Sequence, residues 1–429
     1  MTQMDTPRGD NDSGTAQIFA RIAGAEGSDG PDAQEGRNGL RFIGSLSLTK
    51  VSDGLIDPKL VLSWLMTSLG APGALAAALV PIREAGALLP QVGYAAIVDR
   101  LSHRKWMWVA GSLGQGLSAL GIAAAGATLE GTAAGLVICA LLAILALSRA
   151  ACSISTKDVL GRTVEQTRRG AVTGLAGSVA SIGVLIFALL LMSGLLQDRT
   201  PVLIAVALAG VFWLLAAGLF SMIEEPAVET RDHPQFPPIR KILSEDANLR
   251  HFILVRGLLV STALAPPWLV VLAGEGAILQ QLGALVLASA AASFVSSFVW
   301  GRLADQSSRH VLALVGVIAA LAMAGMLVLA ALGLADTVWA GPAVLFVLML
   351  AYHGVRQGRS TYLVDASPED QRATYSAVAN LSIGLILLAA GAFGGGLGTV
   401  SASLALGGFA AMALAGGLLA LRLQEVEDA

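Results

Sequence analysis

Charged residues stand inside apolar stretches of this sequence, where ions are costly. The segment VPIREAGALLPQ, residues 80–91, carries Arg83 next to Glu84, and Asp53 and Asp57 precede it. Charged side chains within a membrane normally face a protein interior or a watery cavity, where they pair with one another. A carboxylate held beside an arginine in such a cavity could bind and release a proton.

Arg83 and Glu84 are neighbours on one helix and point in different directions, so each needs a partner on another helix. Asp53 and Asp57 are spaced i,i+4 and are expected to share one helix face toward Arg83. Arg149, in the apolar stretch LSRAACS, is the expected partner of Glu84. Two hypotheses stay open for these groups: proton binding that alternates with substrate binding, or a static ion pair. For Asp57, capping of a helix end beside the following proline is a further alternative.

A second group of polar residues lies later in the chain. It comprises Arg256 and, further along the chain, Tyr352, His353, Arg356 and Arg359 in AYHGVRQGRSTYLVD, residues 351–365. Arginine suits carboxylate and phosphate groups, so these residues are candidates for lining a substrate cavity. Alternatively, Arg356 and Arg359 extend outward from a helix end. His353 either titrates near neutral pH or is a packing residue.

The composition is that of a membrane protein. Of 429 residues, 55% are hydrophobic and 13% are charged, with a mean hydropathy of +0.72, whereas soluble domains have about 25% charged residues. Two cysteines indicate neither a disulfide framework nor a metal site. The motifs of nucleotide-driven pumps, zinc proteases and serine hydrolases are missing from the sequence. We therefore expect no enzyme, no catalytic residue, no metal, no cofactor and no nucleic-acid partner.

A membrane-spanning helix needs about 20 mostly apolar residues, and the sequence contains twelve such stretches. The expected spans are 45–69, 74–98, 106–128, 132–157, 171–195, 201–222, 251–273, 277–300, 310–333, 339–362, 374–396 and 400–421. The predicted architecture is an all-α membrane protein with six-helix bundles at 45–222 and 251–422. The other expected segments are a disordered tail at 1–44, a linker at 223–250 with a short amphipathic helix from about 238, and a tail at 423–429. The first span is expected to start near Ser45 and to run through Asp53, Asp57 and Lys59.

Basic residues set the orientation of the spans. We expect the protein in the cell (inner or plasma) membrane with both termini in the cytoplasm. In this orientation Arg199 is the only basic residue in an outer loop. The cytoplasmic segments then hold Arg100, Arg104, Lys105, Arg162, Arg168, Arg169, Arg231, Arg240, Lys241, Arg250, Arg302, Arg309 and Arg372.

The two halves of the chain repeat one another. AAIVDRLSHRK follows the second span and GRLADQSSRH the eighth, with Asp99 and Asp305 separated by 206 residues. Ser155-Thr156 and Ser360-Thr361 are 205 residues apart. Landmarks at nearly one offset indicate two related halves.

After residue 45 the sequence resembles the major facilitator superfamily of secondary transporters. That family carries the pattern G-x-L-A-D-R-x-G-R-[RK] between spans 2 and 3 and between spans 8 and 9. Its second copy matches here through Gly301, Leu303, Ala304, Asp305 and Arg309. The first copy matches less well: Asp99 and Arg100 fit, Arg104 keeps the charge, and other positions depart from the pattern.

The resemblance implies a monomer that moves a small-molecule substrate across the bilayer by alternating access. It also implies that the loops at Asp99 and Asp305 form cytoplasmic latches between the halves. Alternatively, the basic residues of these loops only set the orientation of the spans. Arg149 resembles an arginine of the fourth span that the family links to proton coupling, so protons are the expected coupling ion. A lipid flippase or a non-transport membrane assembly factor on the same scaffold stays as an alternative, because fold does not fix function.

Overall fold

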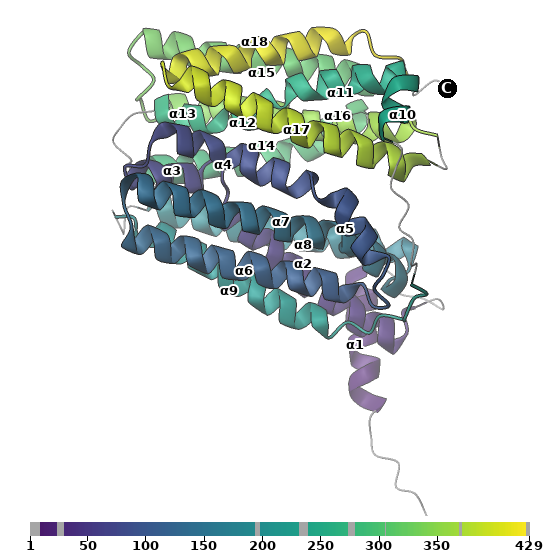
Figure 1. The fold of residues 1–429 in the computed structure, drawn as a ribbon. Coiled ribbons are helices and arrows are strands. Elements are labelled where there is room, and N and C mark those ends of the chain that lie inside the picture. The colour runs from purple at the N-terminus through teal and green to yellow at the C-terminus, as the bar shows by residue number, and fades with distance from the viewer. Residues whose placement is uncertain are drawn as a thin grey trace, which may run out of the picture.

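The computed structural model describes residues 9–23, 30–193, 198–230, 239–272, 279–304, 306–368 and 371–425, and these residues form helices and connecting segments without strands. Figure 1 shows two helical bundles, one above the other. The all-helical class predicted from the sequence is confirmed.

The first half is the bundle that precedes the linker. Its helices are α2 (Ala33–Leu55), α3 (Val61–Ser68), α4 (Gly73–Leu88), α5 (Gln91–Val98), α6 (Lys105–Thr128), α7 (Gly131–Thr163), α8 (Gln166–Met192) and α9 (Thr200–Ser221). The second half follows α10 (Ile239–Glu245), which lies where the linker helix is expected. Its helices are α11 (Ala247–Leu259), α12 (Ser261–Leu264), α13 (Pro266–Leu272), α14 (Leu279–Ala304), α15 (Ser308–Ala331), α16 (Ala340–Asp365), α17 (Arg372–Gly398) and α18 (Ala402–Ala420).

Nine helical stretches among the described residues are long and apolar enough to cross a membrane. The expected spans 45–69, 277–300 and 339–362 contain helices but fall outside this set, and residues 277–278 lie outside the described part of the chain. The first is interrupted, α14 offers only a shorter apolar stretch at Gln281–Ser296, and α16 carries polar side chains in its second half. The protein is a multi-pass membrane protein, and for these three segments the count of twelve spans stays a prediction.

The first span is a broken helix, which corrects the continuous helix expected from the sequence. Helix α2 ends at Leu55 and α3 begins at Val61. Pro58 lacks a backbone N–H and disfavours helical geometry in the residue before it, so the helix stops there. Asp57 therefore lies in the break and does not share a helical face with Asp53.

The segment 1–44, expected to be a disordered tail, contains helical structure. Residues 9–23 form α1, and α2 begins at Ala33, where the Asp32 carboxylate accepts the Glu35 N–H at 2.6 Å and caps the helix. Phe19 of α1 is buried against α2 and fills the space left by Gly39. A hydrophobic contact between α1 and α2 thus orders a segment whose composition is polar.

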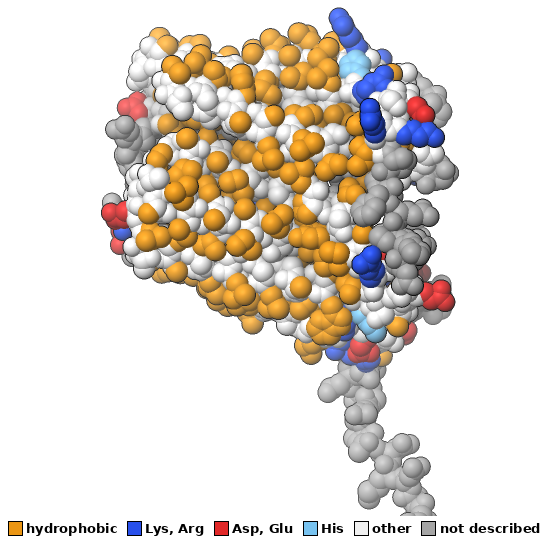
Figure 2. All heavy atoms as spheres, viewed as in Figure 1, with side chains coloured by type: hydrophobic (Ala, Val, Ile, Leu, Met, Phe, Trp, Pro, Cys, Tyr) orange, Lys and Arg blue, Asp and Glu red, His pale blue; other side chains and the backbone are white. Residues whose placement is uncertain are grey.

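Charges mark the two ends of the molecule. Figure 2 shows hydrophobic side chains over the broad faces of both halves, with charged side chains along the edges. We call the end that carries the linker, the start of α6 and the end of α18 the linker side, and the other end the opposite side. The halves contact one another through α4 with α17 and α8 with α14.

These contacts are close where glycine is present. A side chain at Gly391 of α17 would overlap the Pro81 ring of α4, and one at Gly283 of α14 would overlap Met192 of α8. Met192 ends α8 and Gly283 lies near the start of α14, so this second contact is at the opposite side.

Candidate functional site

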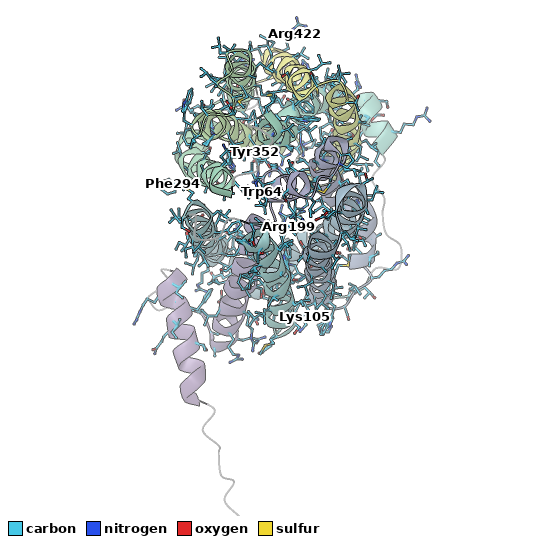
Figure 3. The ribbon with its side chains drawn as sticks, turned by 90° about the vertical axis from the view of Figure 1, so that its left-hand side faces the viewer. Trp64, Lys105, Arg199, Phe294, Tyr352 and Arg422 are labelled. Atoms are coloured by element: carbon cyan, nitrogen blue, oxygen red, sulfur yellow. The ribbon has the colours of Figure 1, made fainter. Side chains whose placement is uncertain are left out.

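A cavity of about 490 Å³ lies between the two halves, lined by residues of α2, α4, α7 and α8 from the first and of α14 and α16 from the second. Figure 3 views the molecule from the opposite side and shows Trp64 of α3 and Tyr352 of α16 near the seam between the halves. Most of the candidate residues from the sequence line this cavity.

Asp53 on α2 is held by two arginines. The Arg83 Nη2 atom of α4 donates to Asp53 Oδ1 at 2.8 Å, and Arg149 Nη1 of α7 donates to both carboxylate oxygens. Arg83 is 7% exposed, so the ion pair replaces the water that its guanidinium loses on burial. Three helices of the first half are thereby tied at one carboxylate. Arg149 was expected to meet Glu84, and the structure pairs it with Asp53 instead.

Glu84 meets Lys59, a residue that sequence analysis did not single out as a site residue. Lys59 Nζ lies 3.8 Å from Glu84 Oε1 and 3.6 Å from the centre of the Tyr352 ring. The ring face attracts the ammonium group, so Lys59 links the first half to α16 of the second. A lysine beside a proline within an apolar stretch was the available signal, and it points into the cavity because the helix breaks there.

Asp57 serves as a cap within the break. Its Oδ1 atom accepts the Lys59 backbone N–H at 2.7 Å, and its carbonyl accepts the N–H of Leu62 at 3.0 Å. These bonds occupy amides at the start of α3 that would otherwise lack acceptors. The capping alternative for Asp57 therefore describes its geometry, although the carboxylate also lines the cavity.

The second half contributes four of its five candidate residues to the wall. Tyr352, His353, Arg356 and Arg359 all line the cavity from α16. Arg256 is placed differently from expectation: it is buried behind the wall and donates to Asn380 Oδ1 at 3.1 Å.

Asn380 continues this contact across the seam. Its Nδ2 atom donates to Oε1 of Gln91 at 3.2 Å, and Gln91, in the first half, lines the cavity. A hydrogen-bonded chain thus runs from a buried arginine of the second half to the first half.

The first motif loop is bound within its own half. Arg104 contacts Asp99 at 3.4 Å and Asp158, near the end of α7, at 2.8 Å. Glu225, just after α9, accepts the backbone N–H groups of Arg104 and Lys105 at 3.1 and 2.8 Å. This carboxylate caps the start of α6, and neither Asp99 nor Arg104 has an ion pair with the second half among the described residues. Arg100 is exposed beside them.

The second motif loop shows a parallel arrangement. Glu425, just after α18, pairs with Arg309 and accepts the Ser307 hydroxyl at 2.7 Å. A glutamate that follows the last helix of each half thus binds the basic loop of that half. Gly301 lies in α14, and Asp305 lies outside the described residues.

Comparison with solved structures finds the same fold in several transporters. The nucleoside transporter NupG is 12% identical, with a TM-score of 0.66 over 90% of this chain and 98% of its own. A D-xylose–proton symporter is 11% identical, with a TM-score of 0.65 over 91% and 98% of the two chains. A POT family peptide transporter is 12% identical, with a TM-score of 0.66 over 90% and 97%. At these identities the likeness shows the fold alone.

Comparison with curated proteins gives no match. The family model described as "Major Facilitator Superfamily" matches residues 45–386, most of the chain. With two related halves, a shared cavity and this match, the chain belongs to the major facilitator superfamily.

Proposed function

We propose that this protein is a secondary transporter that carries a small solute across a membrane by alternating access. The observation that carries the proposal is a polar cavity enclosed by both halves within an apolar membrane-spanning fold. Sites of this kind lie near the midplane at the junction of the repeats, and rocking of the halves exposes them to either side. Both halves that line the cavity belong to the same chain, which supports a monomer as the working unit.

The contacts between the halves favour a state that is open toward the linker side. At the opposite side α8 meets α14 at Gly283, and α3 contacts α13. On the linker side the basic loops pair within their own halves, and Arg356 in the cavity wall is exposed. These pairings support a state in which the latch proposed at Asp99 is released; it would form when the cavity opens to the opposite side.

The linker side is proposed to face the cytoplasm, so that both termini lie on the cytoplasmic side of the cell membrane. Of the basic residues at helix ends, Arg199 lies at the opposite side, paired with Glu130 at 3.1 Å. The linker side holds Arg100, Arg104, Lys105, Arg162, Arg168, Arg169, Arg240, Lys241, Arg250, Arg309 and Arg372. This asymmetry is the distribution expected when basic loops stay inside.

Glu84 is the carboxylate that we propose for proton coupling. Asp53 is engaged by two guanidinium groups and Asp57 by backbone amides. Glu84 has one ammonium partner at 3.8 Å and a side chain that is 36% exposed. Its partner, Lys59, also touches Tyr352 of the other half, so movement of the halves would change the surroundings of Glu84. The D-xylose–proton symporter of the same fold is named for such coupling.

The experiment that tests transport compares the small-molecule contents of cells that express the protein with those of cells carrying an empty vector. Both are measured with the proton gradient intact and collapsed. The proposal expects at least one solute to change with expression, and only while the gradient is present. If no solute changes in either condition, the transporter proposal fails. Translocation of a lipid headgroup without any solute change would favour the flippase instead.

A further inference from the structure

The cavity is lined by more positive than negative side chains, and this excess of positive charge bears on the charge of its ligand. Five cationic side chains line the cavity, Lys59, Arg83, Arg149, Arg356 and Arg359, against three anionic ones, Asp53, Asp57 and Glu84. Because the cavity lies between the helices of an apolar fold, an uncompensated charge there costs more than it does in water. From this imbalance we propose that the transported solute is a small organic anion that carries carboxylate or phosphate groups. The inference rests on the proposed transport function and deepens it.

The three carboxylates already have partners in the protein. Asp53 binds Arg83 and Arg149, and Asp57 accepts the Lys59 N–H. Glu84 faces the Lys59 ammonium. Each of these contacts is made by a residue of the first half, so the first half is close to balance by itself.

The excess positive charge lies on α16 of the second half. Arg356 and Arg359 are spaced i,i+3, so they lie on one face of that helix, and both line the cavity. Within the described part of the chain, neither guanidinium forms an ion pair with an acidic side chain. Two forked donors on one helix face suit the oxygen atoms of a carboxylate or phosphate group.

Arg256 adds to the positive field from behind the wall. It is 4% exposed, and its one hydrogen bond to a side chain goes to the neutral amide of Asn380. Its Nε atom has no hydrogen-bond partner among the described atoms. A buried arginine without an ion-paired carboxylate among the described residues is costly, and an anion in the adjacent cavity would lower that cost.

The rest of the wall limits the size and chemistry of the anion. A volume of about 490 Å³ is in the range of small-molecule sites. Hydroxyl groups of Ser153, Ser289 and Ser293 lie around it and can donate to further oxygen atoms. A small polar anion therefore fits better than a large apolar one.

The positions of the cations also indicate how the anion would contact both halves at once. Arg356 and Arg359 belong to the second half, whereas Lys59 and Arg149 belong to the first. A doubly charged solute can engage cations of both halves, and so can hold the halves together while the cavity changes sides. Differential contact of this kind is what allows a ligand to shift a conformational equilibrium.

The test measures ligand-induced thermal stabilisation of the purified full-length protein in detergent. The anionic probes are succinate, citrate and glycerol 3-phosphate; succinamide and glycerol are neutral counterparts, and putrescine is the cation. We expect at least one anion to raise the Tm, with little effect from its neutral counterpart or from putrescine. Arg356→Gln and Arg359→Gln should each weaken that anion's binding about tenfold or more. The matched control, Arg422→Gln with Arg240→Gln, removes two exposed arginines outside the cavity and should leave binding unchanged.

Several results would overturn the inference. These are equal stabilisation by succinamide, stabilisation by putrescine alone, an anion effect that survives loss of both Arg356 and Arg359, and no effect from any anion. Comparison of succinate with succinamide uses the wild-type protein, so it decides the matter even where a variant fails to fold. Gradient-dependent flux of a neutral or cationic solute in cells would overturn the anion inference and leave the transporter proposal intact. Absence of any flux would count against the transporter proposal itself.

Discussion

Arg83 of α4 donates to Asp53 of α2 at 2.8 Å in the wall of the cavity, and this bond compensates a guanidinium that is almost fully buried. The same carboxylate binds Arg149 of α7. Asp53 is thus the common acceptor for two arginines from different helices, and its loss would remove the ion pairs that the described part of the chain gives them.

Asp53→Asn should therefore destabilise the first half. Removal of one partner from a buried ion pair costs about 3–5 kcal/mol because the other charge is left buried and alone. The purified variant is expected to show a large drop in Tm. Adding Arg83→Met should restore part of the loss, since it removes the stranded charge. If Asp53→Asn alone keeps the wild-type Tm, the ion pair does not stabilise the fold.

The contact between Gly391 and Pro81 should control which side of the cavity is open. Gly391→Ala would push a methyl group into the proline ring of α4, and overpacking of this kind costs about 1–3 kcal/mol. This cost raises the free energy of the state described here, so fewer molecules adopt it. A thiol reagent added on the linker side should therefore label a cysteine introduced at Ser289 less. Gly395→Ala is the matched control, because nothing lies within 4 Å of that position on the same helix. Equal labelling in the two variants would count against the gating role of this contact.

Glu225 should stabilise the first motif loop. Glu225→Ala removes the acceptor for the N–H groups of Arg104 and Lys105 at the start of α6. Loss of a helix cap costs about 0.5–2 kcal/mol, so a measurable fall in Tm is expected. Glu229→Ala, an exposed glutamate of the same segment, should have little effect. A result in which both variants behave alike would show that the capping contact contributes nothing.

Glu224 should make the fold weakly sensitive to acid. Burial acts to raise the pKa of Glu224, but hydrogen bonds and charge from Arg41 and Arg37 outweigh it and leave that pKa below the ordinary value of 4.5. Because the pKa of Glu224 is lower in the folded protein, its ionised carboxylate stabilises the folded state at pH values above 4.5. That contribution is lost as the pH falls through the lowered pKa. The effect is small because the side chain is 46% exposed. Thermal unfolding between neutral and acidic pH should show a slightly smaller acid-dependent loss for Glu224→Gln than for the wild type, and an identical loss would contradict the assignment.

The sequence predicted the membrane fold because its main signals are local. Apolar length, loop charges and the repeated Asp99 and Asp305 motifs each need only a short window. The buried charges could also be recognised locally, since Arg83 and Glu84 stand within an apolar stretch. Their partners could not be assigned, because pairing depends on how helices rotate against one another. Arg149 was therefore expected at Glu84 and lies at Asp53.

The broken first span shows why other parts could not be predicted. Asp57-Pro58 was recognised as a helix start, but span length favoured one continuous helix from Ser45. In the structure the span includes both the helix from before Ser45 and a second helix after Pro58, with a break between them. Lys59 lies in this break and lines the cavity. The order in α1 and at the start of α2 depends on burial of Phe19 against Gly39. That tertiary contact has no signature in a polar segment.

The most direct measurement records the pH inside proteoliposomes that contain the purified protein. The added solute is the one that changes in cells, and solute flux is followed at the same time. Wild-type protein should move protons together with the solute, and an imposed pH gradient should drive the flux. Glu84→Gln should still exchange solute but without proton movement, whereas Glu130→Gln, at an exposed position on the opposite side, should behave as wild type. Solute flux with no proton movement in the wild type, or unaltered proton movement in Glu84→Gln, would contradict the account.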